Sequence, residues 1–308
     1  MSRILVIWPS LLEGATIREL VTETAEHVGA RFPEAQLEFI VADDSQGADT
    51  ELNALAAEDS RLRIWTPNSR LGHQRGLIAV LRYMDSDLSL YDVVVTMDAD
   101  GEDRPSDIPR LIEPVLTGQS DLVRAKRGSR SVGNSFRLGY LFYRGLFRTL
   151  TGLRITSGNF AAARGSWWQG EVDSSIWNLS FSGALASVVG RTQDVDCARD
   201  ARRVGRSRMN FGSLLGYGLM FALPFSLRIA VRAAVLAGAA AVVAALLIIT
   251  VTVIRLFTTQ ATPGWATTVV FGAVAVVLMA LVALTSSLVL YSATQSGRKD
   301  SGRFRSRW

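Results

Sequence analysis

The chain has 308 residues, of which 48% are apolar and only 20% charged, a composition that excludes a disordered protein and is too apolar for an ordinary soluble enzyme. Its single cysteine, Cys197, excludes an internal disulfide and a thiolate cluster for structural zinc. The formal net charge is +5, and the last eleven residues carry +4 of it, so we expect a membrane-topology signal and no nucleic-acid partner.

The first two thirds of the chain alternate short apolar runs with segments of helical periodicity. The first run ends at Pro9 and is too short for a signal peptide, which predicts a cytoplasmic start. The alternation predicts an α/β fold with a mainly parallel sheet covered on both faces, and places chemistry at the carboxyl ends of its strands. The predicted strands are Ile4–Trp8, Leu37–Ala42, Leu62–Trp65 and Val93–Met97, and the predicted helices are Ile17–Val28, Gly76–Met84 and Ile108–Leu116.

Two segments that follow predicted strands differ in what they indicate. Residues 9–14 lack the glycine fingerprint of a dinucleotide site, which argues against a dehydrogenase of the usual kind. Asp43 and Asp44 form an acidic turn suited to accept hydrogen bonds from a base N–H or a ribose hydroxyl. The alternative is a simple turn followed by a helix cap at Asp49 or Thr50.

The fourth predicted strand is followed by a concentration of carboxylates. Asp98 and Asp100 stand two residues apart at its end, and Glu102 follows. Burying such charges is costly unless a cation is present, and oxygen ligands suit Mg²⁺ or Mn²⁺. A divalent ion held there can stabilise a nucleotide diphosphate as a leaving group. The alternative is a solvated acidic loop that caps the helix beginning near Asp107.

Apolar residues gather late in the chain. Residues 233–254 form an uncharged run, and residues 256–297 form a second one interrupted by a Pro-Gly pair, so each is long enough to cross a bilayer as a helix. Arg228 and Arg232 precede the first span and the basic tail follows the second, which predicts that both chain ends are cytoplasmic. Long core helices of a soluble protein are the alternative.

Two further segments suit a membrane surface. Residues 209–227 are uncharged but contain several glycines and a proline, which favours interfacial helices over a continuous span. Arg137, Arg144 and Arg148 share one face of a predicted helix and could meet anionic head groups, the alternative being packing on the catalytic domain. The tryptophans 167 and 168 suit either sugar stacking or an interface anchor.

The order of these motifs resembles that of family 2 glycosyltransferases, in the branch of dolichol-phosphate mannose synthases and bacterial polyprenyl-phosphate glycosyltransferases, over nearly the whole chain. The resemblance implies an A-type glycosyltransferase fold followed by interfacial helices and two transmembrane helices. It implies metal ligation by Asp98, Asp100 and Glu102. The residues implied for donor binding are Pro9, Glu13, Asp43, Asp44, Gly72, His73, Asp98, Ala99 and Asp100.

For the acceptor phosphate, arginines are suitable because a guanidinium binds phosphate oxygens bidentately. The catalytic candidates are Asp98 and Asp100, the arginines Arg127, Arg203 and Arg208, and Asp173 as an electrostatic partner. The implied activity is inverting transfer of one sugar from a nucleotide sugar to a polyprenyl phosphate for a cell-envelope glycan. The expected donor is a UDP-sugar, with a GDP-sugar left open, and a homo-oligomer is also left open.

The predicted organisation is a cytoplasmic catalytic domain at 1–208, interfacial helices at 209–232, a two-helix anchor of the plasma (inner) membrane at 233–297 and a basic cytoplasmic tail at 298–308. Three residues depart from the family pattern. Leu11 and Leu12 stand where tyrosine and asparagine are usual, and Asn159 stands where aspartate is typical. These departures motivate the alternative of a non-catalytic membrane scaffold or partner subunit.

Overall fold

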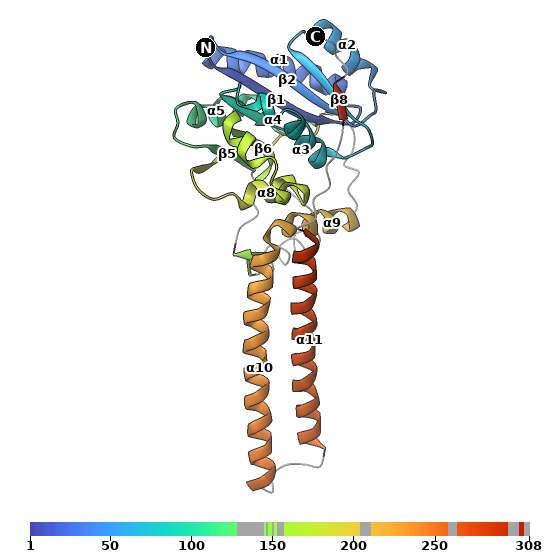
Figure 1. Cartoon of the computed structure of the whole chain (residues 1–308), viewed down its shortest axis with the longest axis vertical. Coiled ribbons are helices and arrows are strands. Elements are labelled where there is room, and N and C mark those ends of the chain that lie inside the picture. The colour runs from blue at the N-terminus through green and yellow to red at the C-terminus, as the bar shows by residue number, and fades with distance from the viewer. Residues whose placement is uncertain are drawn as a thin grey trace. The chain divides into compact units, whose positions relative to one another are not determined.

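The structure is a computed structural model that describes residues 1–127, 145, 147–149, 151–152, 157–203, 211–257, 264–294 and 302–304. Contacts between residues divide the chain into two compact units. The first comprises Met1–Gly133, Ile155–Phe221 and Gly297–Trp308, and the second comprises Asn134–Arg154 and Ala222–Ser296. The first unit contains a sheet with flanking helices, and the second contains two long apolar helices (Figure 1).

The sheet of the first unit has eight strands in the order β7-β5-β6-β4-β1-β2-β3-β8. β1, β2, β3, β4, β5 and β7 run parallel, whereas β6 and β8 run antiparallel to their neighbours. The predicted mainly parallel sheet is therefore confirmed. The strands are β1 (Arg3–Ser10), β2 (Gln36–Asp43), β3 (Leu62–Pro67), β4 (Val93–Thr96), β5 (Leu122–Arg127), β6 (Ser157–Ala163), β7 (Thr192–Cys197) and β8 (Gly302–Phe304).

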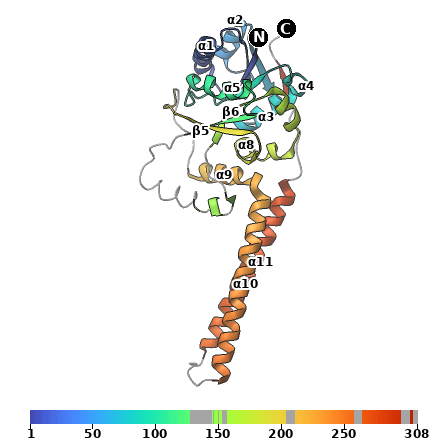
Figure 2. The same ribbon diagram turned by 90° about the vertical axis from the view of Figure 1, so that its left-hand side faces the viewer.

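Helices cover both faces of this sheet, as Figure 2 shows for α5 on one side and α8 on the other. Side chains alternate along a strand, so Val6 of β1 packs in the core beneath α1, α2 and α5, while its neighbour Ile7 packs in the core beneath α3 and α8. The helices are α1 (Gly14–Arg31), α2 (Thr50–Glu58), α3 (His73–Tyr83), α4 (Asp85–Leu88), η1 (Pro105–Asp107), α5 (Ile108–Leu116), α7 (Gly165–Glu171), η2 (Ser175–Asn178), α8 (Phe181–Ser187) and α9 (Phe211–Ala222).

The four strands and three helices predicted before residue 120 are all present. Three strands of the sheet were not predicted. β6 inserts antiparallel between β4 and β5, β7 pairs with the edge of β5, and β8 adds residues of the basic tail to the edge of β3. The tail predicted only as a cytoplasmic extension therefore supplies a short edge strand.

The second unit contains η3 (Leu223–Phe225), α10 (Ser226–Phe257) and α11 (Trp265–Thr294). Two helical stretches, Gly218–Phe257 and Thr267–Ser286, are long and apolar enough to cross a membrane, and few of their residues are buried. The two predicted spans are thus present as helices. α10 begins seven residues before the predicted start at 233, and residues 134–154 group with α10 and α11 rather than with the sheet.

Candidate functional site

The two aspartates that end β2 have different roles. Asp43 is fully buried, and its carboxylate accepts hydrogen bonds from the backbone N–H groups of Ser45 and Gly47, each at 2.9 Å. It therefore closes the turn, and its donor-binding role stays a prediction. Asp44 instead accepts hydrogen bonds from the backbone of Leu71 at 2.6 Å and Gly72 at 3.2 Å, and so joins the end of β2 to the loop before α3.

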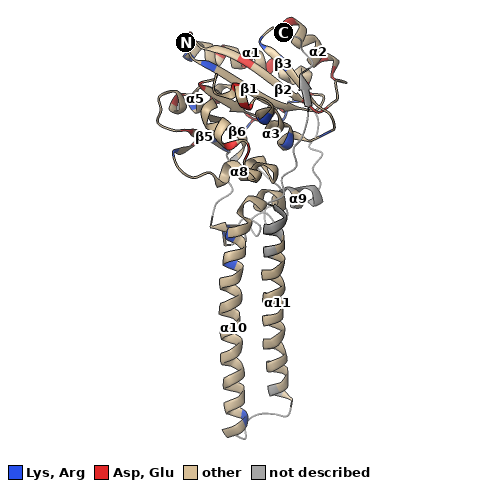
Figure 3. Cartoon of the chain, viewed as in Figure 1, with Lys and Arg blue, Asp and Glu red and all other residues tan. Residues whose placement is uncertain are grey.

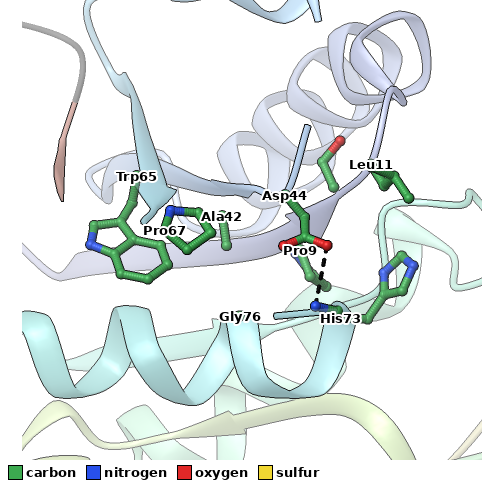
Figure 4. A pocket seen from close by; sticks show the side chains of 10 residues that line it. Pro9, Leu11, Ala42, Asp44, Trp65, Pro67, His73 and Gly76 are labelled. Atoms are coloured by element: carbon green, nitrogen blue, oxygen red, sulfur yellow. Dashed lines mark hydrogen bonds between the residues drawn. The ribbon is translucent and has the colours of Figure 1, made fainter. Parts of the chain in front are cut away.

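A small pocket lies between the ends of β1, β2 and β3 and the start of α3. Its cavity volume is about 40 Å³, well below the roughly 300–1,000 Å³ that ligand pockets span. Asp44 reaches across it toward the first residues of α3, as Figure 4 shows. Apolar and aromatic side chains form much of the wall, so a flat ring could stack there beside one carboxylate. The lining residues are Pro9, Ser10, Leu11, Ala42, Asp44, Trp65, Pro67, Gly72, His73 and Gly76.

Asp49 holds the start of α1 in place by a hydrogen bond to its backbone. This side chain caps α2 by accepting from Leu52 N at 3.0 Å, which confirms the predicted helix cap, and its second oxygen accepts from Gly14 N at 2.9 Å. Only glycine fits at position 14, because an added Cβ would lie 2.5 Å from the Asp49 carboxylate. Glu13, the preceding residue, is thereby held in place with its side chain only 12% exposed.

Burial raises the pKa of Glu13 above its ordinary value, and the charges of His73 and Arg202 partly offset the shift. His73 begins α3 and lines the pocket, so the carboxylate of Glu13 lies within the electrostatic reach of the pocket wall. Glu13 thus interacts electrostatically both with the pocket wall and with Asp100, which follows β4.

The carboxylates after β4 lie at the same edge of the sheet. Asp98 accepts a hydrogen bond from Asn159 Nδ2 at 2.8 Å, and Asn159 is itself fixed because its carbonyl accepts from Thr96 Oγ1 at 2.7 Å. Asp100 accepts from Glu102 N at 3.0 Å, which turns the chain tightly after the strand. Asp98 and Asp100 are partly exposed, whereas Ala99 between them is buried.

A basic segment at Arg199–Arg203 lies against this acidic end. Its backbone is held by Asp200 N donating to Glu102 O at 2.9 Å and Arg203 N donating to Asp100 O at 3.2 Å. Arg199 forms an ion pair with Glu102, whose side chain is 5% exposed. Glu102 thus has an arginine partner, and its role as a metal ligand stays a prediction.

Adjacent arginines of this segment have different partners. Arg202 donates to Glu13 Oε1 at 2.9 Å and lies 4.0 Å from Asp100 Oδ2. Arg203 instead binds Glu19 and Glu23 of α1 at 2.7–2.8 Å, and these partners raise its pKa further above its ordinary value. The guanidinium beside the acidic site is thus that of Arg202, which was not predicted, and Arg203 fastens the segment to α1.

The donor set at the end of β4 fits a hard divalent cation. Mg²⁺ is commonly held by one or two carboxylates, with waters and substrate phosphates as its other ligands. Asp98 and Asp100 supply such a pair, and Asp100 Oδ2 lies 4.0 Å from the guanidinium of Arg202. Within the described ranges there is no group of three or more acidic, histidine or cysteine side chains that could hold a metal.

Other predicted residues lie elsewhere. Asp173 is exposed just beyond α7, and the neighbouring Val172 carbonyl accepts from Arg82 Nε at 2.9 Å, near the end of α3 opposite to His73. The structure therefore does not bring Asp173 to the acidic site. Trp168 is fully buried among aromatic side chains and its neighbour Trp167 packs against it, which assigns the pair to the core. The side chain of Arg127 and residues 137, 144 and 208 lie outside the described part of the chain.

Sequence reasoning missed Arg202, the pocket wall residue Trp65 and the bond between Asn159 and Asp98. The signal for Arg202 was available, because adjacent residues of an extended segment point to opposite sides, so only one of the arginines 202 and 203 could face Asp100. No local signal pairs Asn159 with Asp98, since 61 residues separate them.

Comparison with known proteins finds similar solved structures. Glucosyl-3-phosphoglycerate synthase from Mycobacterium tuberculosis is 22% identical over 74% of this chain and 80% of that chain, with a TM-score of 0.48. The structure of S. aureus TarS 1-349 is 14% identical over 76% of this chain and 64% of that one, with a TM-score of 0.44. No curated protein matches the sequence. The model of the family described as glycosyl transferase family 2 matches residues 5–168, more than half of the chain, and this protein therefore belongs to that family.

Proposed function

We propose that this protein is a membrane-anchored, metal-dependent enzyme that transfers one sugar from a nucleotide sugar to a polyprenyl phosphate, with inversion at the anomeric carbon. One observation carries the proposal. The same chain joins a family 2 glycosyltransferase sheet with a lined pocket to two helices long and apolar enough to cross a bilayer. An acceptor with a polyprenyl tail is itself confined to the bilayer, so anchoring the enzyme there places enzyme and acceptor on one surface.

The pocket supports binding of the donor nucleoside. Trp65 and Pro67 offer an apolar wall for stacking a base, and Asp44 offers a carboxylate to a base N–H or a ribose hydroxyl. Because both oxygens of Asp44 also hold the backbone of residues 71 and 72, the carboxylate is oriented before a ligand arrives. We propose a UDP-sugar as donor, as in the M. tuberculosis synthase structure that contains UDP.

Asp98 and Asp100 would hold Mg²⁺ or Mn²⁺, the ions present in structures of the M. tuberculosis synthase. Such an ion would supply charge stabilisation of the departing diphosphate. Asn159 fixes the Asp98 carboxylate and Glu102 N fixes that of Asp100, which supports binding of an ion by pre-positioned ligands.

The acceptor needs orientation more than activation. A phosphate monoester with a second pKa of about 6 is largely dianionic at neutral pH, so one of its oxygens can attack the anomeric carbon without a general base. The bond between that carbon and the diphosphate oxygen breaks, and the nucleoside diphosphate leaves with the electron pair. Arg202, next to Asp100 and Glu13, is the described arginine best placed to orient a phosphate, because its fork retains unused N–H groups.

A transfer assay tests the proposal. Purified full-length protein is given a short polyprenyl phosphate, a panel of radiolabelled nucleotide sugars, and Mg²⁺, Mn²⁺ or a chelator. We expect a lipid-linked product that chelator abolishes and that Asp100→Ala lowers by at least about 100-fold, the scale of losing a main electrostatic contact. Full activity of a folded Asp100→Ala variant would refute the metal role, and transfer only to 3-phosphoglycerate would refute the lipid acceptor.

A specific observation also supports a second candidate, a non-catalytic membrane scaffold. Arg202 and Arg199 already pair with Glu13 and Glu102, and Asn159 replaces the aspartate usual in the family. Calorimetry with UDP and Mg²⁺ separates the two candidates. Metal-dependent nucleotide binding supports the enzyme, whereas no binding by folded protein supports the scaffold.

A further inference from the structure

The second unit is unusual in its charges. Its two segments, Asn134–Arg154 and Ala222–Ser296, contain seven arginines and no aspartate, glutamate or lysine. These arginines therefore have no carboxylate partner within their own unit, unlike Arg202 and Arg203 in the sheet unit. The seven are Arg137, Arg144, Arg148, Arg154, Arg228, Arg232 and Arg255.

Contacts within the unit bring two of these arginines together. Arg232, in the second turn of α10, donates from Nη1 to the carbonyl oxygen of Thr149 at 2.6 Å and reaches that of Arg148 at 3.4 Å. These carbonyls belong to the last residues of a helical turn. Gly152 terminates this turn with a φ of +78°, and its N–H donates to Arg148 O at 2.8 Å. Arg232 thus caps this turn and fixes Arg148 beside the start of α10.

Two more features show that the arrangement is built rather than incidental. Phe147 packs edge-on against Phe225, with ring centroids 5.7 Å apart, and holds the turn against the residues before α10. An added Cβ at Gly152 would lie 2.5 Å from Arg232 Nη2, so a larger residue there would move this guanidinium. Both the backbone and an aromatic contact therefore specify where Arg232 lies.

Arg228 completes the group. It precedes Arg232 by four residues, so the two share one face of α10, and both are exposed, as is Arg148. We call Arg148, Arg228 and Arg232 the arginine collar. The uncharged run 233–254 of α10 begins directly after the arginine collar. Figure 3 shows positive residues only at the two ends of this helix.

We propose that the arginine collar binds the head-group phosphates of anionic phospholipids, such as phosphatidylglycerol or cardiolipin. Three guanidinium groups with no acidic partner in their unit favour an anion, and guanidinium binds phosphate oxygens bidentately. Its position immediately before a bilayer-long apolar run is where head-group phosphates lie, which favours a lipid over free phosphate. This inference is independent of the transfer reaction, because it needs neither donor nor polyprenyl acceptor.

Native mass spectrometry of the detergent-solubilised full chain tests it. The protein is equilibrated with equal amounts of phosphatidylglycerol and phosphatidylcholine of the same acyl chains, and the retained lipids are counted. We expect wild-type protein to retain phosphatidylglycerol preferentially. The double variant Arg148→Gln/Arg228→Gln should lower that preference about 30-fold, equivalent to roughly 2 kcal/mol for two arginines near a membrane surface.

The matched control is Arg255→Gln, which removes one exposed arginine from the opposite end of the same helix, about 35 Å from Arg232 at 1.5 Å per residue. Its preference should equal that of wild type. Equal retention of the two lipids by wild type, an equal loss in Arg255→Gln, or displacement of the lipid by millimolar inorganic phosphate would each overturn the proposal.

A second variant tests the arrangement without changing the charge. Gly152→Ala keeps all seven arginines but displaces the Arg232 guanidinium. We expect a several-fold lower preference for phosphatidylglycerol in protein whose helical circular dichroism is unchanged. An undiminished preference would contradict the role of the Arg232 contacts.

Discussion

Arg202 donates a hydrogen bond from Nη2 to Glu13 Oε1 at 2.9 Å, and the same nitrogen lies 4.0 Å from Asp100 Oδ2. The cationic side chain therefore lies between the start of α1 and the proposed metal ligand. A guanidinium and a divalent ion near one carboxylate repel each other, so we expect Arg202 to lower the affinity of Asp100 for a metal until a diphosphate brings additional negative charge.

We predict that Arg202→Gln binds Mn²⁺ several-fold more tightly than wild type without nucleotide, yet transfers sugar more slowly because a phosphate contact is lost. Free Mn²⁺ in a titration, followed by electron paramagnetic resonance, measures the affinity. Arg203→Gln is the matched control, since Arg203 binds Glu19 and Glu23 instead. Unchanged Mn²⁺ affinity in Arg202→Gln would contradict this account.

Asp44→Asn tests the link between the pocket and the loop before α3. An amide has only one acceptor oxygen, so its NH₂ group would face the N–H of Leu71 or Gly72. We expect the KM for the donor to rise about tenfold, in line with loss of roughly 1–2 kcal/mol for a hydrogen bond to a charged group. Asp43→Asn should mainly lower the melting temperature, because Asp43 is buried and closes its own turn. A raised donor KM in Asp43→Asn alone would reverse these assignments.

Leu12 has a φ of +60° and is 59% exposed. The left-handed region costs most residues about 1–2 kcal/mol, and asparagine tolerates it better. We therefore predict that Leu12→Asn raises the melting temperature by about 2 °C, the shift expected for roughly 1 kcal/mol in a protein of this size. Leu11→Asn, at a neighbouring position without a positive φ, should give no gain. A lower melting temperature for Leu12→Asn would argue that its side chain makes contacts of its own.

Local patterns were sufficient for the parallel strands, the long helices and the acidic end of β4. Buried parallel strands read as short runs of branched apolar residues, and a bilayer-length helix needs only an uncharged run. β6 escaped prediction because its Ser157–Ala163 sequence is mostly small residues and its place between β4 and β5 depends on pairing with distant strands. Residues 134–154 were expected with the catalytic domain, yet Arg232 binds the carbonyls of this segment 83 residues away.

The sequence also did not show which of two adjacent residues makes a given contact. Asp43 and Asp44 are chemically identical, and only the tight turn after β2 decides that one faces inward and the other faces the pocket. Glu102 has the chemistry of a metal ligand, but Arg199, 97 residues later, pairs with it. Residue type predicts what a side chain can bind, whereas its partner depends on which distant segment packs beside it.

Asn159→Asp restores the residue usual in the family and tests whether this site is tuned for a cation. The new carboxylate would take the place of an amide that now donates to Asp98 Oδ1 at 2.8 Å, at a position only 6% exposed. Ionising both of two carboxylates this close together costs free energy, so in the variant the pair titrates with a raised pKa. An acid whose pKa is raised in the folded state stabilises that state at low pH. This contribution is lost as the pH rises through the raised pKa.

The variant should therefore have a lower melting temperature than wild type at pH 7.5 in chelator. This difference should become smaller at pH 5. It should also become smaller at pH 7.5 with Mn²⁺, because the ion neutralises the pair of carboxylates. Differential scanning fluorimetry at both pH values, with Mn²⁺ and with chelator, measures this pattern. Asn159→Ala is the control, because it removes the hydrogen bond without adding a charge, and its loss of about 1–3 kcal/mol should not grow between pH 5 and pH 7.5 as that of a second carboxylate would. If Asn159→Asp melts as Asn159→Ala does under all four conditions, the two side chains do not share a cation, and Asp98 would then be a structural residue held by Asn159.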